Sequence, residues 1–367
     1  MADLTALTLE LQNALRDYPA GHWVAIAPGA SEVVAEAADP AAVLTSARNS
    51  GHNDPIIIKV PDALPPVDTR YKPDDVVPTP GIYDAWKSGR VVPFLGAGAS
   101  ISGGMPTVST LIEVLARKAQ FPLSGFWDLD LAKVSSFYEM RIGRPALYDE
   151  LRGMLAASQR AVPGALHRFI ASDAGRCAKL IMTTNYDTLI EQALAARGVP
   201  YDLLVYPTDA TGENANAALW IPHGGRPEYR AANTLAITFE NTVVYKMHGS
   251  LGAAAEWDSF VITEDDYMEF LARMIARTAI PTAILDYLPK RQLLFLGYGL
   301  RDWNLRVVLQ NLNTVLTAGN RRRPPSWAIQ RRPSPVECAL WLTRNIQIFD
   351  QALDEFASEL LKLAGES

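Results

Sequence analysis

The sequence predicts an α/β fold in which a doubly wound parallel sheet is covered by helices on both faces. Two observations lead to this prediction. From about residue 90 onward, short runs rich in Val, Ile, Leu and Phe alternate with helical stretches, which is typical of parallel strands buried on both faces. Glycine-rich or polar motifs directly follow several of these runs, at the edge where such sheets bind their ligands.

The length and composition fit one large α/β domain with an appendage, or two domains. The chain has 367 residues, of which 49% are hydrophobic and 20% are charged, so it can bury an extensive core. The formal net charge of −6 argues against a broad nucleic-acid surface, which needs clustered Lys and Arg. Two arginine clusters, 321–323 and 331–332, could contact a phosphate or an acidic partner, but we interpret them as a solvated rim.

Residues 1–80 are predicted to form a small N-terminal α/β module. Residues 4–15 have a helical pattern, 23–26 form a short strand, and 55–60 are a β-branched run. The proline-rich stretch that follows lacks amide donors and resists both helix and sheet, so we interpret it as a linker. The domain boundary is therefore placed near residue 80, and 81–367 is predicted to be the main domain.

The main domain is predicted to contain six buried strands and a helical insertion. The helix after the first strand begins with Thr107 or Ser109 as its cap. Residues 121–176 form an insertion lobe over the cleft, and 207–240 form a loop and hairpin outside the core. The acidic run 264–266 resembles a paired-carboxylate site, but we interpret it as a helix start. The predicted strands are 91–95, 180–183, 243–247, 293–296, 327–329 and 346–349.

The first strand runs directly into the glycine-rich turn Gly96-Ala97-Gly98-Ala99-Ser100. Only a residue without a Cβ lets backbone amides approach a pyrophosphate closely, and a helix that follows adds its positive N-terminal end. Taken alone, the turn is equally consistent with a tight turn that binds nothing. Its weight comes from three later motifs that also follow apolar runs: Thr183-Thr184-Asn185-Tyr186-Asp187, His248-Gly249-Ser250 and Gly297-Tyr298-Gly299-Leu300-Arg301-Asp302.

In this order, the four motifs resemble those of the sirtuin family, and more narrowly those of the sirtuin-like NAD-consuming proteins of bacterial antiphage defence. The resemblance covers about residues 86–365. It implies a Rossmann-like fold with NAD as the substrate. The paired Cys-x-x-Cys zinc ligands of sirtuin deacetylases are absent, since the chain has only Cys177 and Cys338, so no zinc is expected. The segment 104–109 also departs from the deacetylase pattern, which disfavours lysine deacylation.

Three residues of these motifs are candidates for catalysis. Cleavage of the bond between nicotinamide and ribose passes through an oxocarbenium-like state. Asn185 can fix a ribose hydroxyl or a water, Asp187 can stabilise positive charge, and His248 can act as general base. An ordinary helix cap is an equal alternative for Arg301 and Asp302. The expected dinucleotide-binding residues are Gly96, Ala97, Gly98, Ser100, Thr184, Gly249, Ser250, Gly297, Gly299, Arg301 and Asp302.

The predicted function is hydrolysis of NAD+ to nicotinamide and ADP-ribose by an abortive-infection effector of antiphage defence that stays silent until it is triggered. We expect a cytoplasmic protein, because the sequence shows no targeting segment or membrane span. The resemblance implies a homo-oligomer with a hexameric ATPase or helicase-type protein, or another defence component, as its partner. Residues 1–80 would serve assembly or sensing. Two alternatives remain: a non-hydrolytic sensor of NAD or ADP-ribose, and an ADP-ribosyl transferase or deacylase.

Overall fold

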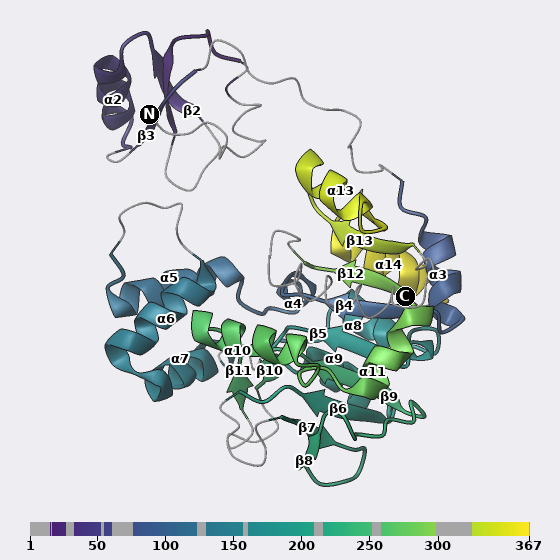
Figure 1. Cartoon of the computed structure of the whole chain (residues 1–367). Helices are drawn as coiled ribbons and strands as arrows, with labels where there is room; N and C mark the ends of the chain where they lie inside the picture. The colour runs from purple at the N-terminus through teal and green to yellow at the C-terminus, as the bar shows by residue number, and fades with distance from the viewer. Residues whose placement is uncertain are drawn as a thin grey trace. The chain divides into compact units, whose positions relative to one another are not determined.

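In the computed structural model, the described residues form two compact units, one made of residues up to 60 and the other of residues from 76 onward (Figure 1). Of the predicted N-terminal helix over 4–15, only Leu15 belongs to the described part of the chain. The predicted linker lies mostly outside the described residues, and its last two positions open a helix at Thr79. The structure describes residues 15, 17–26, 33–52, 55–60, 76–122, 130–156, 161–208, 216–251, 258–298 and 325–366.

In its described residues, the first unit contains a small antiparallel sheet that packs against the helix α2 (Pro40–Asn49). Its strands β1 (Trp23–Ile26), β2 (Val33–Ala37) and β3 (Ile56–Lys59) are ordered β2-β1-β3. The helix α2 begins where the Asp39 carboxylate accepts from the Ala42 amide. Alternate residues of β1 face opposite sides, so one side packs against α2 and the other forms a separate apolar cluster.

Among the described residues, the second unit is built on a nine-stranded sheet with the order β14-β13-β12-β4-β5-β9-β6-β7-β8 (Figure 1). The strands from β14 to β6 run parallel, and the hairpin β7–β8 is antiparallel at one edge. The strands are β4 (Val91–Leu95), β5 (Leu180–Thr183), β6 (Tyr201–Val205), β7 (Ala217–Ile221), β8 (Glu228–Ala231), β9 (Thr242–Lys246), β12 (Gln292–Leu296), β13 (Ser326–Gln330) and β14 (Ile346–Asp350).

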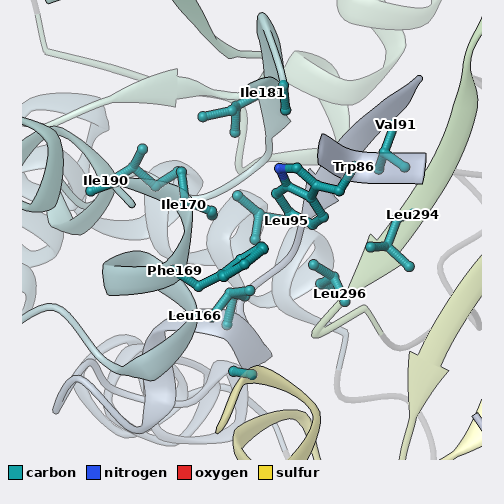
Figure 2. Close-up of a cluster of buried hydrophobic side chains, with 14 of the residues drawn as sticks. Trp86, Val91, Leu95, Leu166, Phe169, Ile170, Ile181, Ile190, Leu294 and Leu296 are labelled. Atoms are coloured by element: carbon teal, nitrogen blue, oxygen red, sulfur yellow. The ribbon is translucent and has the colours of Figure 1, made fainter. Parts of the chain in front are cut away.

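Helices cover both faces of this sheet, which confirms the predicted doubly wound α/β fold. Alternation along β4 sends Val92 and Phe94 into one apolar cluster and Val91 and Leu95 into the other. The second cluster surrounds the fully buried Trp86, whose indole N–H donates to the Gly175 carbonyl at 2.8 Å (Figure 2). One face carries α10 (Glu264–Ile275), α11 (Thr282–Tyr287) and α13 (Pro335–Leu342); the other carries α3 (Thr79–Lys87), α8 (Ala165–Ile170), α9 (Leu189–Ala196) and α14 (Leu353–Leu363).

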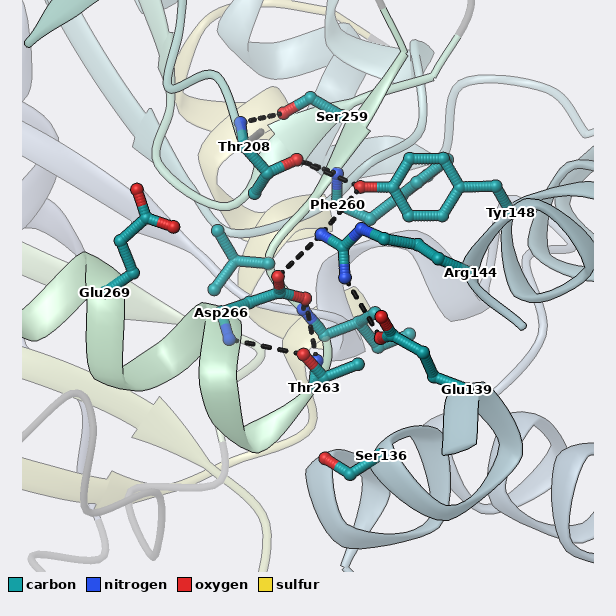
Figure 3. Close-up of polar contacts among 12 residues, drawn as sticks. Ser136, Glu139, Arg144, Tyr148, Thr208, Ser259, Phe260, Thr263, Asp266 and Glu269 are labelled. Atoms are coloured by element: carbon teal, nitrogen blue, oxygen red, sulfur yellow. Dashed lines mark hydrogen bonds and ion pairs between the residues drawn. The ribbon is translucent and has the colours of Figure 1, made fainter. Parts of the chain in front are cut away.

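A helical lobe with its own apolar cluster adjoins the sheet. It consists of α5 (Val108–Ala119), α6 (Leu131–Ile142) and α7 (Arg144–Ala156). Figure 3 shows how Arg144 connects this lobe to the start of α10, because its guanidinium donates to the Asp266 carboxylate at 2.6 Å. Tyr148 adds a 3.0 Å contact between its hydroxyl and that of Thr208. The lobe is therefore bonded to the first turn of α10 and to Thr208, which follows β6.

The sheet differs from the sequence prediction at one edge. The prediction omits β6 and places 207–240 outside the core. A hairpin is present there as β7 and β8, but β7 pairs with β6 and so extends the main sheet. The run Tyr201–Val205 includes a polar Asp202, and its last three residues are buried in the apolar clusters on the two faces of the sheet. Within the part of the chain that the structure describes, no helix combines the length and apolarity needed to cross a bilayer.

Candidate active site

Two loops meet at the point where the winding of the sheet reverses. β4 pairs with β5 along one edge and with β12 along the other, and its carboxyl end leads into Gly96. The Gly96 amide donates to the Leu296 carbonyl at 3.0 Å, and the Gly98 amide donates to the Gly297 carbonyl at 2.9 Å. A crevice at this reversal point is where open parallel sheets bind nucleotides. The fold therefore places two of the predicted motifs against each other at that position.

Glycine is required where these loops cross. Gly297 has a φ of +69°, and a Cβ on it would lie 2.3 Å from the Ala99 backbone nitrogen. A Cβ on Gly96 or Gly98 would lie 2.8 Å from the Gly297 carbonyl oxygen. The obstacles are backbone atoms, which cannot rotate away as a side chain can. The crossing therefore depends on the absence of all three Cβ atoms.

A short helix that the sequence does not predict lies between the glycine turn and the predicted helix. α4 (Gly98–Ile101) is a single turn, and the longer α5 starts only at Val108. Of the two candidate caps, Thr107 caps α5, because its side chain accepts from the Thr110 amide. A ligand at the glycine crossing would therefore face backbone amides of the loop and of α4, rather than the start of a long helix.

A cavity of about 620 Å³ opens beside this crossing. The predicted residues that line it are Ala97, Ser100, Thr184, Asn185, Asp187, His248 and Gly297. Its apolar wall comes from the helical lobe and the segment before it, through Met105, Leu111, Ile112, Leu131 and Leu155. The volume falls in the range of pockets that hold small-molecule ligands and cofactors.

Four predicted residues are not in the lining, and three lie outside the described residues. Gly96 and Gly98 belong to the glycine crossing, next to Ala97 and Gly297 of the lining. Gly249 and Ser250 form the short strand β10 (Gly249–Ser250), which pairs with β11 (Ser259–Phe260). A Cβ on Gly249 would lie 2.0 Å from the Ser259 carbonyl oxygen, so this glycine has a packing role. The three residues outside the described part are Gly299, Arg301 and Asp302.

A hydrogen-bond network connects the glycine turn to the motif after β5. The Asn185 amide nitrogen donates to the Gly96 carbonyl and to the Ser100 hydroxyl, each at 2.9 Å. The Ser100 hydroxyl donates in turn to the Asp187 carboxylate at 2.7 Å. The other oxygen of Asp187 accepts from the Leu189 amide at the start of α9, at 3.0 Å. Since both donors of Asn185 are used, the atom that it can offer to a ligand is its amide oxygen.

Three tyrosines that the sequence analysis does not single out also line the cavity: Tyr186, Tyr267 and Tyr298. The Tyr298 hydroxyl donates to the Thr184 hydroxyl at 2.8 Å, which links the loop after β12 to the loop after β5. Its position between two motif glycines is the signal that could have identified it. Tyr267 follows the acidic run 264–266, which is confirmed as a helix start with Thr263 as the cap of α10.

His248 lies at the cavity with only 6% of its surface exposed. Its ring contacts those of Tyr267 and Phe270 edge-on, with 5.3 Å between ring centroids in each pair. Burial disfavours the charged form and lowers the pKa of His248 to about 3. The imidazole is therefore neutral near pH 7, as the sequence analysis expects of a base, but it is a weaker base than an exposed histidine.

The low pKa of His248 predicts a pH dependence of stability. Below about pH 6.5 the unfolded state binds a proton on this histidine and the folded state does not. The free energy of unfolding should therefore fall as the pH drops from 6.5 toward 3, by up to about 1.4 kcal/mol per pH unit. Urea unfolding of the parent and of His248→Gln between pH 4 and 7 measures this contribution. The variant should lose less stability on acidification, and equal pH slopes for the two proteins would contradict the low pKa.

The described lining carries acidic groups but no Lys or Arg. Asp130 and Asp187 are the carboxylates that line the cavity. Asp130 also caps α6, where its carboxylate accepts from the Ala132 amide at 2.7 Å. Within the described ranges, no three His, Cys, Asp or Glu side chains are grouped as a metal site requires. A phosphate at the described wall would thus be bound by backbone amides and hydroxyls.

Comparison with known proteins finds similarity to one family model and to several relatives. Residues 179–349 match the family model of the SIR2-like domain. The chain is 24% identical over 283 residues to defense-associated sirtuin 2 of Bacillus subtilis, covering 74% of this chain and 24% of that protein. It is 26% identical over 257 residues to the NAD(+) hydrolase ThsA of Enterococcus faecium, covering 68% and 45%. The resemblance that the four motifs indicate is thereby confirmed.

A second ThsA, from Acinetobacter baumannii, is 26% identical over 230 residues, covering 62% of this chain and 40% of that protein. The chain thus spans from about a quarter to less than half of the length of these relatives. Among solved structures, Sir2Tm bound to a propionylated peptide aligns with a TM-score of 0.40 at 12% identity, covering 79% of this chain and 100% of that one. A second structure, from a study of the mechanism and regulation of Sir2 enzymes, aligns with a TM-score of 0.37 at 12% identity. The alignment covers 78% of this chain and 97% of that one.

Proposed function

We propose that this chain, which contains a SIR2-like domain, hydrolyses NAD+ to nicotinamide and ADP-ribose. The observation that carries the proposal is that Asn185, Asp187 and His248 meet at one cavity beside the glycine crossing. Two relatives that are named NAD(+) hydrolase ThsA support it. In this proposal, the pyrophosphate lies against the Ala97–Ser100 backbone and the reacting ribose lies near Asn185 and His248.

The proposed reaction breaks the bond between the nicotinamide nitrogen and C1′ of the ribose. Nicotinamide leaves as a neutral molecule with the bonding electron pair, and C1′ gains oxocarbenium character. The Asp187 carboxylate stabilises this positive charge, while the Asn185 amide oxygen accepts a hydrogen bond from a ribose hydroxyl or from the attacking water. The water oxygen bonds to C1′, which completes ADP-ribose.

His248 takes the proton that this water loses. A pKa of about 3 makes it a weak base in the empty site. A weak base is sufficient here, because water becomes strongly acidic as it bonds to an oxocarbenium carbon. The neutral state of His248 also keeps a positive charge away from the cationic nicotinamide ring while the substrate binds.

We also propose the biological setting that the relatives' names suggest. The defence-associated sirtuin supports a role as an abortive-infection effector of antiphage defence in the cytoplasm, restrained until a trigger arrives. We propose a homo-oligomer with a hexameric ATPase or helicase-type protein or another defence component as partner. Residues 1–80 would act as an assembly or sensing module attached to the catalytic domain over 81–367, with its insertion at 121–176.

The proposed function predicts that NAD+ yields nicotinamide and ADP-ribose in equal amounts. Chromatography of both products, at several protein concentrations and in water labelled with oxygen-18, measures this stoichiometry and should find the label in ADP-ribose. If nicotinamide is released but the ADP-ribose is found attached to protein, the activity is ADP-ribosyl transfer and not hydrolysis. If calorimetry detects NAD+ binding but no nicotinamide is released, the protein is a non-hydrolytic sensor and not a hydrolase.

A further inference from the structure

The ammonium group of Lys246 is completely buried next to the turn that carries Asn185 and Asp187. Lys246 is the last residue of β9, two positions before His248, and its side chain has 0% exposure. Lysine is almost never fully buried unless it is paired. Its position on the strand that leads to His248 gives this buried charge a direct connection to the candidate base.

All three N–H groups of Lys246 have acceptors. One acceptor is the Glu191 carboxylate, at 2.8 Å, in α9. The other two are main-chain carbonyls: that of Tyr186, at 3.3 Å, and that of Asp187. These carbonyls belong to the peptide groups immediately before and after Asp187. Lys246 therefore holds both peptide planes that flank this carboxylate, and its contact with Glu191 ties the turn to α9.

Stability alone does not explain this arrangement. The second carboxylate oxygen of Glu191 is buried and has no hydrogen-bond partner among the described residues. Replacing a buried ion pair by apolar side chains of similar volume is often neutral or stabilising. An apolar pair, however, cannot form directional bonds to the two carbonyls of the turn. What the charged pair adds is a defined orientation of the turn.

We propose that Lys246, oriented by Glu191, is a positioning residue for the cleavage reaction. It keeps the turn that carries Asn185 and Asp187 aligned with His248, because the anchor is the last residue of β9 and the base follows it by two positions. The Ser100 bridge between Asp187 and Asn185 transmits this orientation to the amide. The role in catalysis rests on the proposed function, whereas the anchoring of the turn can be measured without turnover.

The test separates orientation from stability. Lys246→Met alone leaves Glu191 buried without its partner, so it should destabilise the protein. The double variant Lys246→Met/Glu191→Leu should recover a urea midpoint close to that of the parent. Its kcat should nevertheless stay lower by on the order of ten- to a hundredfold, with KM little changed, because the turn is misplaced. A double variant that regains both stability and kcat would overturn the proposal.

A matched control is Arg152→Met/Asp258→Leu, which removes the 2.7 Å ion pair between the lobe and the segment before β11, away from the cavity lining. It should leave kcat unchanged. Hydrogen exchange of the Leu189 amide, which donates to Asp187, is a readout independent of activity. This amide should exchange faster in the double variant, and unchanged exchange would overturn the proposal. If the parent protein does not cleave NAD+, only the proposed function is refuted. Hydrogen exchange of the Leu189 amide still tests whether Lys246 anchors the turn.

Discussion

Asn185→Ala is expected to lower kcat for NAD+ cleavage by on the order of a hundredfold or more while the protein remains folded. The substitution removes the amide oxygen that, in the proposed reaction, accepts from a ribose hydroxyl or from the attacking water. It also removes the two donors that hold the Gly96 carbonyl and the Ser100 hydroxyl at 2.9 Å. Ser100 then loses the partner that orients it toward Asp187, so one change disturbs the water-positioning group and the carboxylate together.

The loss of stability should be small by comparison. Asn185 is half-buried at a cavity, where water can replace the missing amide, and each hydrogen bond contributes about 1 kcal/mol. Nicotinamide release and urea unfolding measure the two effects. Asn241→Ala is the matched control, since its amide donates to Asp202 at 3.3 Å at the amino end of β9, away from the cavity. If the kcat of Asn185→Ala is close to that of the control, Asn185 does not take part in catalysis.

Gly297→Ala is expected to abolish measurable NAD+ binding and to lower the free energy of unfolding by about 2–5 kcal/mol. The added Cβ would lie 2.3 Å from the Ala99 nitrogen and 2.7 Å from the Gly98 carbonyl carbon. To admit it, the loops after β4 and β12 must separate, which breaks the bond between the Gly98 amide and the Gly297 carbonyl. The positive φ of Gly297 adds strain that alanine cannot relieve.

Calorimetry with NAD+ and urea unfolding of the purified variant measure both losses. The control is Gly153→Ala in α7, where a Cβ would meet nothing within 4 Å. That change should be neutral or stabilising by up to about 1 kcal/mol, because alanine favours a helix more than glycine does. NAD+ binding by Gly297→Ala with the affinity of the parent would show that the crossing does not form the nucleotide site.

Much of the site could be predicted from the sequence because of one property of parallel sheets. The carboxyl ends of neighbouring strands meet at one edge, so motifs that directly follow strands converge whatever their separation in the chain. Asn185 and His248 follow β5 and β9, which pair directly, and both line the cavity with Ser100. The caps Thr107 and Thr263 were equally accessible, because a helix start depends on neighbouring residues.

Contacts that depend on the third dimension could not be predicted in the same way. Gly249 and Ser250 belong to the His248 motif, yet they pair with β11 and are not part of the cavity lining. Lys246 has no motif signature, and its partners lie 55 to 60 positions earlier in the chain. The strand β6 is buried because Leu204 packs into the apolar cluster on one face of the sheet, and Leu203 and Val205 pack into the cluster on the other.

Local sequence patterns are therefore sufficient to predict the doubly wound class, the edge of the sheet at which the candidate site lies, and the residue types gathered there. These follow from local periodicity and from the chirality and direction of parallel strands, which act over short stretches of chain. The tertiary structure alone decided which atoms of those residues face the cavity, how deeply His248 is buried, and how Lys246 holds the turn. Burial and hydrogen-bond partnership are properties of packed neighbours, and residues distant in the chain become neighbours only after folding.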